Sequence, residues 1–253
     1  MVKKDYDSGK MTRNEFLQPN FAPNQLDRYI IRRAILSSIM TQLPNMHGIL
    51  LDVGCGQKPY KPLLLGPDSK VNQYIGLDLE HNPIHNNHPD IIWQNGEIPL
   101  AHGSIDCAIA TEVFEHCPDP ESIMGEIFRV LKPDGFLFFT VPFLWPLHEV
   151  PYGQYRYTPF SLQRHLSASG FVDIQQTPMG GWDASLAQML GLWVRRRSMG
   201  KRIRRFLSAI VMLVIFWLHR VDKRTIVGFR ESAMITGLSG TARKPSEAAP
   251  SGG

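Results

Sequence analysis

A short turn rich in glycine follows the first apolar run of the chain. The run covers residues 48–53, and Gly54, Cys55 and Gly56 come directly after it. Two glycines separated by one small residue let the backbone turn sharply and approach a ligand closely. A dinucleotide fingerprint would place a third glycine where Pro59 stands, so the pattern argues against a diphosphate ligand. An ordinary strand-to-helix turn, with Pro59 in the first turn of the helix, is the alternative explanation.

The next apolar run, residues 74–79, carries one carboxylate near its end. This residue is Asp78, which lies 22 positions after Gly56. A carboxylate at the end of a second strand accepts hydrogen bonds from the hydroxyls of a ribose, and Glu80 is the substitute if the register differs. The turn and the carboxylate together predict a site for an adenosine-containing cofactor that lacks a diphosphate.

A third group of polar side chains lies in residues 142–158, which are rich in aromatic residues and have neither helical nor strand periodicity. Loops of this kind on a rigid scaffold commonly carry function. The candidate general bases are His148, Glu149 and, from an earlier segment, His116. The candidate substrate contacts are Tyr152, Tyr155 and Arg156, whose guanidinium suits a carboxylate or phosphate. A rim of solvated polar groups around packed aromatics is the alternative.

Alternating elements must position these groups. Short apolar runs predict strands at residues 48–53, 74–79, 105–111, 136–141 and 171–176. Amphipathic segments predict helices at residues 24–40, 118–132 and 159–169, the second of them with Asp119 as its N-cap. Strands that alternate with helices predict an open α/β fold, in which a mostly parallel sheet is covered on both faces. Ligands of such sheets bind at the carboxyl ends of the strands.

Composition divides the chain and limits its class. A chain of 253 residues with 43% hydrophobic and 20% charged residues is neither a disordered protein nor a small disulfide scaffold. The three cysteines form no CxxC pair and residues 1–10 lack an apolar stretch, so a cytoplasmic protein without a zinc ribbon is expected. The expected segments are a flexible lead-in (1–23), a core with an N-terminal helix (24–178), a basic and apolar helical insertion (179–224), a last strand (225–244) and a disordered tail (245–253).

The positive charge of the chain is concentrated in one segment. Ten Lys or Arg residues but a single acidic residue, Asp222, lie between Arg195 and Arg224, so the remainder is net acidic although the whole chain carries +4. Residues 206–218 form an uncharged apolar run; at ~1.5 Å per residue it spans about 20 Å, less than the ~30 Å hydrocarbon core of a bilayer. Cations beside an apolar run predict that residues 195–224 lie on an anionic membrane surface. Packing against the core or a partner chain is the alternative, and nucleic-acid binding is not expected.

Five motifs follow one another between residues 49 and 141. They are Leu-Asp-Val-Gly-Cys-Gly, Gly-Leu-Asp, Ile-Pro-Leu-Ala-His-Gly-Ser-Ile-Asp, Glu-Val-Phe-Glu-His-Cys-Pro-Asp-Pro and Arg-Val-Leu-Lys-Pro-Asp-Gly. In order and spacing this part of the chain resembles class I S-adenosylmethionine-dependent methyltransferases of the methyltransferase-11 type. The resemblance extends more loosely to residue 176, and residues 142–158 are similar to a stretch of methyltransferases encoded with bacterial surface-polysaccharide enzymes.

The resemblance implies a Rossmann-like sheet of seven strands with an antiparallel last strand near residues 233–243, after a helical insertion. It also implies S-adenosylmethionine as cofactor. The residues that it places at the cofactor are Asp52, Gly54, Cys55, Gly56, Asp78, Leu79, Asn95, Gly96, Glu97, Thr111, Glu112 and His116. Among these, Asp52 and the glycine turn would face the methionine end, Asp78 the ribose, residues 95–97 the adenine, and Thr111, Glu112 and His116 the sulfonium.

The expected activity is methyl transfer to an oxygen of a sugar or lipid-linked glycan at the inner face of a membrane. The alternatives are a quinone or another hydrophobic small molecule as acceptor, and a non-catalytic cofactor-binding partner in a membrane-associated complex; Pro59 disfavours an NAD-dependent oxidoreductase. No metal is expected, because His81, His85 and His88 lie in a loop without a Cys or acidic cluster. Cys55 and Cys117 are expected to be packing residues.

Overall fold

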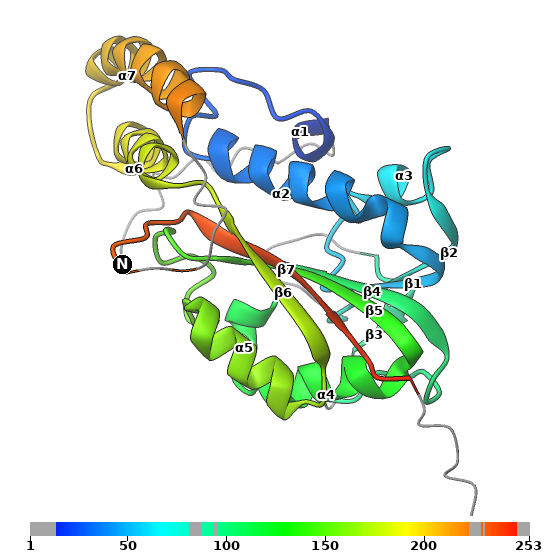
Figure 1. Cartoon of the computed structure of the whole chain (residues 1–253). Helices are drawn as coiled ribbons and strands as arrows, with labels where there is room; N and C mark the ends of the chain where they lie inside the picture. Colours follow the sequence, from blue (N-terminus) through cyan, green and yellow to red (C-terminus); the bar gives the residue numbers. More distant parts are fainter. Residues whose placement is uncertain (1–13, 81–87, 94–95, 223–228, 230, 247–253) are drawn as a thin grey trace, which may run out of the picture. The chain divides into compact units, whose positions relative to one another are not determined.

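The computed structural model describes residues 14–80, 88–93, 96–222, 229 and 231–246, and within them seven strands form one sheet. The strands are β1 (His47–Val53), β2 (Lys70–Asp78), β3 (Ile91–Ile92), β4 (Ile105–Thr111), β5 (Leu131–Pro142), β6 (Val172–Met179) and β7 (Gly237–Arg243) (Figure 1). The helices are α1 (Asn14–Leu17), α2 (Tyr29–Gln42), α3 (Lys61–Leu64), α4 (Pro120–Val130), α5 (Pro159–Ala168), α6 (Trp182–Arg196) and α7 (Lys201–Val221), with 3-10 turns at Leu43–Asn45 and Phe114–His116.

The sheet brings the predicted site elements to one edge. Its strand order is β3-β2-β1-β4-β5-β7-β6, with β1 parallel to both β2 and β4. Val53 at the end of β1 pairs with Leu77 and with Ala110, so the turn after β1, Asp78 and Thr111 share the carboxyl edge of the sheet. The last strand, β7, pairs antiparallel with β5. The predicted seven-stranded α/β fold with an antiparallel last strand is therefore confirmed.

Some element bounds differ from those predicted. β2 begins at Lys70 rather than at residue 74, because pairing with β1 holds its polar first half in the sheet. The glycine turn does not lead directly into a helix at Pro59; a single helical turn, α3, begins at Lys61. The N-cap prediction is confirmed, since the side chain of Asp119 accepts a hydrogen bond from the amide of Ser122 at 3.2 Å.

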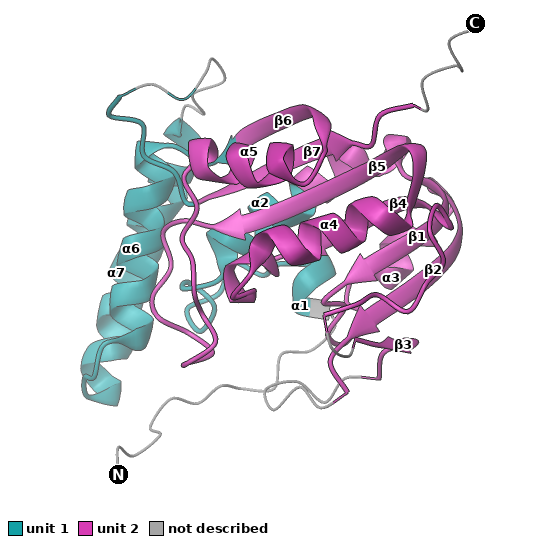
Figure 2. Cartoon of the chain, turned by 90° about the horizontal axis from the view of Figure 1, so that it is seen from below, with its two compact units in different colours: residues 1–37, 178–236 teal, residues 38–177, 237–253 magenta. Residues whose placement is uncertain are grey.

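The chain divides into two compact units (Figure 2). Unit 1 comprises residues 1–37 and 178–236, and unit 2 comprises residues 38–177 and 237–253. Unit 2 contains nearly all of the sheet, and α4 and α5 lie together on one of its faces (Figure 1). The expected lead-in 1–23 is described only from residue 14, where α1 begins, and most of the expected tail 245–253 lies outside the described residues.

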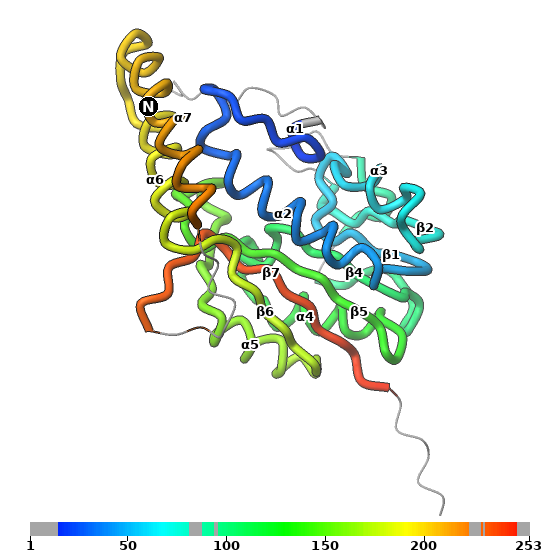
Figure 3. The backbone as a smooth tube through the Cα atoms, turned by 45° about the horizontal axis from the view of Figure 1, so that its top comes forward, coloured from blue at the N-terminus to red at the C-terminus, as the bar shows by residue number. Residues whose placement is uncertain are grey.

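Unit 1 is built around the helix pair α6 and α7, which the chain enters after β6 (Figure 3). Their shared core consists of Leu26, Ile30, Ala184, Ala187, Val194, Val211, Ile215 and Leu218. Asp222, the one acidic residue of the basic segment, accepts hydrogen bonds from the amides of Gly181 and Ala184 and so caps the N-terminus of α6. Within the described residues, no helix combines the length and the apolar character needed to cross a bilayer.

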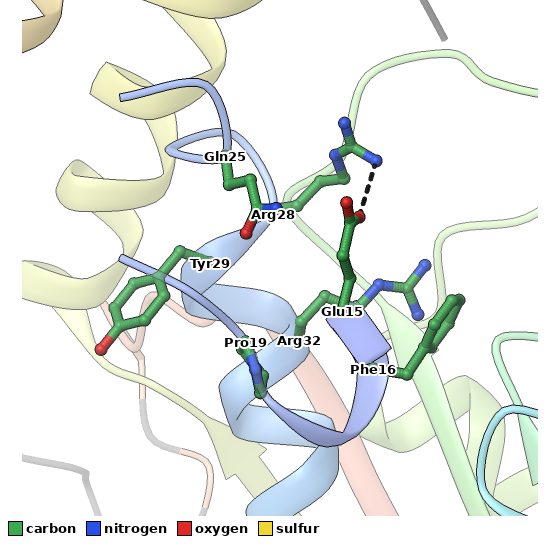
Figure 4. Close-up of a pocket in the computed structure, with 7 residues that line it drawn as sticks. All are labelled: Glu15, Phe16, Pro19, Gln25, Arg28, Tyr29 and Arg32. Atoms are coloured by element: carbon green, nitrogen blue, oxygen red, sulfur yellow. Dashed lines mark ion pairs between the residues drawn. The ribbon is translucent and has the colours of Figure 1, made fainter. Parts of the chain in front are cut away.

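A pocket in unit 1 lies between α1 and the start of α2 (Figure 4). Its lining residues are Glu15, Phe16, Pro19, Gln25, Arg28, Tyr29 and Arg32. The Nη1 atom of Arg28 lies 3.6 Å from Oε2 of Glu15, and the guanidinium of Arg32 stacks 4.0 Å above the ring of Phe16. These contacts join α1 to α2, and none of the predicted site residues lines this pocket.

Candidate active site

The turn after β1 adopts a backbone conformation that favours glycine. Gly54 has a φ of +66° and Gly56 a φ of +51°, in the left-handed region. A Cβ on Gly54 would lie 2.6 Å from Cγ2 of Val113, so the turn approaches the segment after β4 closely. A Cβ on Gly56 would meet no atom within 4 Å. The turn therefore packs tightly on one side and faces open space on the other.

Asp78 joins this turn to the end of β2. Its Oδ2 accepts a hydrogen bond from the amide of Gly56 at 2.7 Å, and its Oδ1 accepts one from the amide of Leu79 at 2.8 Å. The amide of Cys55 in turn donates to the carbonyl of Leu77 at 3.0 Å. Asp78 is buried, yet each carboxylate oxygen keeps an acceptor position beyond the one that the backbone uses.

Asp52 is buried on β1, the strand next to the one that ends in Asp78. The hydroxyl of Tyr74 on β2 donates a hydrogen bond to its Oδ2. Burial raises the pKa of Asp52 to about 7, with a smaller upward contribution from Asp78, whereas the Tyr74 hydrogen bond and Lys58 act in the opposite direction. Asp52 thus changes charge near neutral pH, beneath the glycine turn.

The residues predicted to lie around the adenine are only partly described. Asn95 lies outside the described residues, whereas Gly96 and Glu97 are exposed. Leu79, directly after Asp78, is half exposed. An apolar side chain beside a buried carboxylate offers both an apolar surface and a hydrogen-bond acceptor to a ligand.

The carboxyl end of β4 carries the next candidates. Thr111 is the last residue of β4, and Glu112 follows it with a φ of +56°, a conformation that is uncommon for a residue with a side chain. The hydroxyl of Thr140 on β5 donates to Oε1 of Glu112 at 3.1 Å, and the Glu112 amide donates to the Thr140 carbonyl. The backbone of Glu112 is therefore held by the neighbouring strand.

The turn Phe114–His116 follows Glu112 in the sequence and contacts the loop of residues 142–158. Nε2 of His116 lies 3.5 Å from Oε2 of Glu149 and 3.6 Å from Oε1 of Glu115. The rings of His116 and His148 are 4.9 Å apart between centroids. The structure thus brings together the three candidate bases, and it adds Glu115, which the sequence analysis did not single out.

His148 is a weak base in this setting. Burial lowers its pKa to about 4, and the neighbouring His116 acts in the same direction. Nη2 of Arg156 lies 3.3 Å from Nδ1 of His148 and also donates to the carbonyl of Pro146 at 3.1 Å. A neutral imidazole of such low basicity has little driving force to accept a hydroxyl proton at neutral pH.

The three predicted substrate contacts differ in their surroundings. Tyr152 is exposed. The hydroxyl of Tyr155 donates to the carbonyl of Pro118 at 3.0 Å, and its ring stacks on Tyr157. Arg156 donates hydrogen bonds to the carbonyls of Tyr155, at 2.7 Å, and Pro146. Its guanidinium therefore stabilises the loop and also lies beside His148.

Sequence reasoning missed Tyr74, Val113 and Glu115. Tyr74 lies on the predicted second strand, but nothing in its spacing indicates a bond to Asp52. Glu115 stands in the quoted Glu-Val-Phe-Glu-His-Cys-Pro-Asp-Pro motif, and its proximity to His116 along the chain was the available signal. The loop histidines His81 and His85 lie outside the described residues, and His88 is exposed. Cys55 and Cys117 are buried free thiols, as expected of packing residues.

Comparisons with known proteins agree with this geometry. Residues 51–139 match a family model described as a methyltransferase domain. Over 112 residues the chain is 28% identical to a ubiquinone biosynthesis O-methyltransferase of Thiobacillus denitrificans, covering 40% of this chain and 47% of that one. The structure of a SAM-dependent methyltransferase from Archaeoglobus fulgidus superposes with a TM-score of 0.52 at 14% identity, over 91% of this chain and 97% of the other.

The same fold occurs in a protein named for another reaction. The [4+2]-cyclase SpnF superposes with a TM-score of 0.53 at 19% identity, over 87% of this chain and 85% of that one. At such identities the superpositions show the fold alone. The sequence matches cover between 29% and 50% of the length of the curated relatives. The reaction must therefore be argued from the site itself.

Proposed function

Because the chain carries a class I S-adenosylmethionine-dependent methyltransferase domain, we propose that it transfers the methyl group of S-adenosylmethionine to an oxygen of a sugar or lipid-linked glycan. When bound, the cofactor supplies a methyl group already activated by a sulfonium. The protein then has to position the acceptor oxygen and remove its proton. The observation that carries the proposal is the bond between Asp78 and the amide of Gly56, which joins the glycine turn to the carboxylate after β2.

The described residues fit this cofactor. The glycine turn faces open space at Gly56, where a side chain would otherwise stand. The carboxylate of Asp78 is an acceptor with capacity left for the two ribose hydroxyls, and half-exposed Leu79 offers an apolar surface to the adenine. Asp52, Thr111 and Glu112 are proposed to lie toward the methionine end. Anionic side chains suit a ligand that carries positive charge there.

An oxygen acceptor is favoured by the groups beside the turn. His116 and Glu149 are proton-accepting groups that a nucleophile with a removable proton would use, and the weakly basic His148 lies beside His116. Arg156 and the exposed ring of Tyr152 belong to the same loop, and we assign them to acceptor binding. A quinone or another hydrophobic hydroxyl compound is the second candidate acceptor.

The activity is tested by supplying methyl-labelled S-adenosylmethionine together with glycan, glycolipid and quinone acceptors. We expect label in a hydroxyl-bearing glycan or glycolipid, with S-adenosylhomocysteine formed in equal amount. Label in the quinone would move the assignment to the second class of acceptor. Cofactor binding by calorimetry without turnover on any acceptor would instead indicate a non-catalytic cofactor-binding protein.

The affinity for S-adenosylmethionine should rise with pH up to about 7. Asp52 has its pKa raised to about 7 in the free protein, and a bound cation favours its ionised form. The complex then binds fewer protons than the free protein, so the dissociation constant falls as Asp52 ionises, by up to about tenfold per pH unit, and levels off above that pKa. Calorimetric titration between pH 6 and 8 measures this slope.

Asp52→Asn is the matched control for this prediction. The variant keeps a hydrogen-bond acceptor for Tyr74 but carries no titrating group, and it reports any ionisation of the ligand itself. We expect the affinity of the variant to follow only that remaining dependence. An equal slope in both proteins would show that Asp52 does not sense the cofactor.

We also propose that unit 1 places the protein on an anionic membrane surface. One face of α7 presents an exposed apolar row at helical spacing, which we call the α7 stripe. Its members are Ile203, Phe206, Ile210, Leu213, Trp217 and Val221. The opposite face of α7, with Val211, Ile215 and Leu218, is packed inside unit 1. One face of α7 is therefore packed inside unit 1, and the α7 stripe is the part left for a partner.

Charge and composition favour a lipid surface as that partner. The exposed cations Arg197, Lys201, Arg202 and Arg205 surround the start of α7, whereas Arg196 is paired with Asp27 at 3.1 Å. A helix with an aromatic and aliphatic face flanked by basic residues is typical of interfacial anchoring. A second exposed row on α6 adds apolar surface to unit 1; its members are Trp182, Leu186, Met189 and Trp193.

A further inference from the structure

Three side chains beside the glycine turn offer the ligand set of a divalent metal ion. One ligand atom each from Glu115, His116 and His148 lies within 4.8 Å of the others. They come from the turn after β4 and from the loop after β5, which the backbone ties together: the amides of Gln154 and Tyr155 both donate to the carbonyl of Glu115. The cluster is therefore held by two segments of unit 2 and does not depend on one flexible loop.

The burial of Glu115 is the second observation. Its side chain is fully buried, and neither carboxylate oxygen has a hydrogen-bond partner among the described residues. A buried carboxylate normally receives hydrogen bonds, pairs with a cation or coordinates a metal. Arg156, the nearby cation, donates to the carbonyls of Tyr155 and Pro146 rather than to Glu115. Glu115 thus points into the cluster with both oxygens available.

The spacing suits a shared ion better than direct hydrogen bonds. Nε2 of His116 lies 3.6 Å from Oε1 of Glu115 and 3.5 Å from Oε2 of Glu149. A charge-assisted hydrogen bond is typically about 2.7–2.9 Å long. Ligands at about 2.0–2.1 Å from a tetrahedral zinc ion are, by contrast, about 3.3 Å from one another. The Glu115–His116 distance is therefore close to the ligand–ligand distance of a metal site.

We propose that Glu115, His116 and His148 bind a divalent transition-metal ion, zinc being the best match, which holds the acceptor hydroxyl next to the cofactor. Two imidazoles and one carboxylate are a known zinc ligand set with one position left for water or substrate. Nitrogen donors favour such ions over magnesium or calcium. The expectation that the protein needs no metal rested on the loop histidines. Of the ligands named here, Glu115 and His116 are adjacent but His148 lies 32 positions later, so they form no recognisable sequence motif.

This inference rests on the proposed methyl transfer. The metal ion would assist the removal of the proton from the acceptor hydroxyl, a step for which His148 is a weak base. A hydroxyl bound to a divalent cation loses its proton far more readily, and Glu149 is placed to accept that proton. The oxygen then forms a bond to the methyl carbon while the carbon–sulfur bond breaks, and the electron pair of that bond remains on sulfur as a neutral thioether. The proximity of Val113 to Gly54 shows that the ligand-bearing turn adjoins the proposed cofactor turn.

The test uses the full chain, stripped of metal by a chelator and then titrated with cobalt(II) alone and with zinc(II) alone. We expect one equivalent per chain, with the visible absorption of four- or five-coordinate cobalt. Glu115→Gln, His116→Gln and His148→Gln, made singly, should each weaken binding at least tenfold. His165→Gln is the matched control: His165 pairs with Glu121 at 2.9 Å on α5 and α4 but is not in the cluster, so its removal should leave metal affinity unchanged.

The outcomes separate this inference from the proposed function. Cofactor binding is measured by calorimetry on the metal-free protein, and it should persist in Glu115→Gln, His148→Gln and His165→Gln; His116→Gln is left out of this comparison because His116 is also a candidate cofactor contact. Saturable metal binding without cofactor binding would leave the ligand set standing while refuting methyl transfer. Absence of saturable binding in the wild type, or undiminished binding in all three ligand variants, would overturn the metal site and leave the cofactor site untouched. Three separate variants keep the test decisive if one of them fails to fold.

Discussion

Replacing Asp78 with alanine should weaken the binding of S-adenosylmethionine at least a hundredfold. Two hydrogen bonds from ribose hydroxyls to a charged acceptor contribute about 1.5–3 kcal/mol each, and ~1.4 kcal/mol corresponds to a factor of ten in affinity. The same change removes the acceptor that fixes the amide of Gly56, so the turn loses its orientation as well. Titration calorimetry with S-adenosylmethionine and S-adenosylhomocysteine measures the loss, which should be similar for both because they share the ribose.

Two controls distinguish ligand contact from a general loss of structure. Asp173→Ala removes an exposed carboxylate on β6 and should leave the affinity unchanged. Asp78→Asn keeps one acceptor oxygen and should give an intermediate affinity. If Asp78→Ala bound the cofactor as tightly as the wild type while retaining its melting temperature, the ribose assignment would be wrong, and with it the central contact of the proposed site.

The part of the site that the sequence could predict is the part made by backbone turns at strand ends. Gly54, Gly56 and Asp78 follow directly from two apolar runs, because parallel neighbouring strands bring their carboxyl ends to one edge. The position of Asp52 at the end of the first strand was predictable, but its protonation state was not. Its pKa depends on burial and on the hydroxyl of Tyr74, and a contact between side chains of adjacent strands leaves no periodic signal.

The cluster around Glu115 could not be predicted for a different reason. His116 and His148 are 32 positions apart in the sequence, and tertiary hydrogen bonds such as those of residues 154 and 155 to the Glu115 carbonyl bring their segments together. The burial of Glu115 likewise depends on that covering loop. A sequence pattern reports which residues can take part in such a cluster, whereas tertiary contacts decide which of them meet.

For the helices of unit 1, the sequence likewise predicts the helices themselves but not which of their side chains are buried. The apolar pattern predicted a helical insertion over residues 179–224, which contains both α6 and α7, since a helix is a local structure. It did not tell which apolar residues are covered, because α7 is apolar on two faces and only packing shows that Val211 and Ile215 are buried while Leu213 and Trp217 are exposed. The exposed row on α6 went unrecognised for this reason.

Placing two glutamates in the α7 stripe should abolish recruitment to anionic vesicles. Leu213 and Trp217 are 73% and 63% exposed, so Leu213→Glu combined with Trp217→Glu disturbs little internal packing. Burial of each large apolar side chain contributes about 1.5–3 kcal/mol, and the new charges are repelled by the lipid headgroups. We therefore expect at least a hundredfold loss of vesicle affinity in flotation assays. Phe160→Glu is the matched control, because Phe160 is 71% exposed but lies on α5, outside unit 1.

The lipid composition and the oligomeric state decide between the possible partners of this helix. A bilayer contact predicts strong binding to vesicles with anionic lipid, weaker binding to neutral ones, and a loss of affinity at high salt, since each cation near the surface contributes about 1 kcal/mol. If the α7 stripe instead joins two copies of the chain, the wild type should sediment as a dimer and the double variant as a monomer, with no vesicle binding by either. Equal recovery of the wild type on neutral and anionic vesicles would reject the electrostatic part, because the exposed cations around the start of α7 would then contribute nothing.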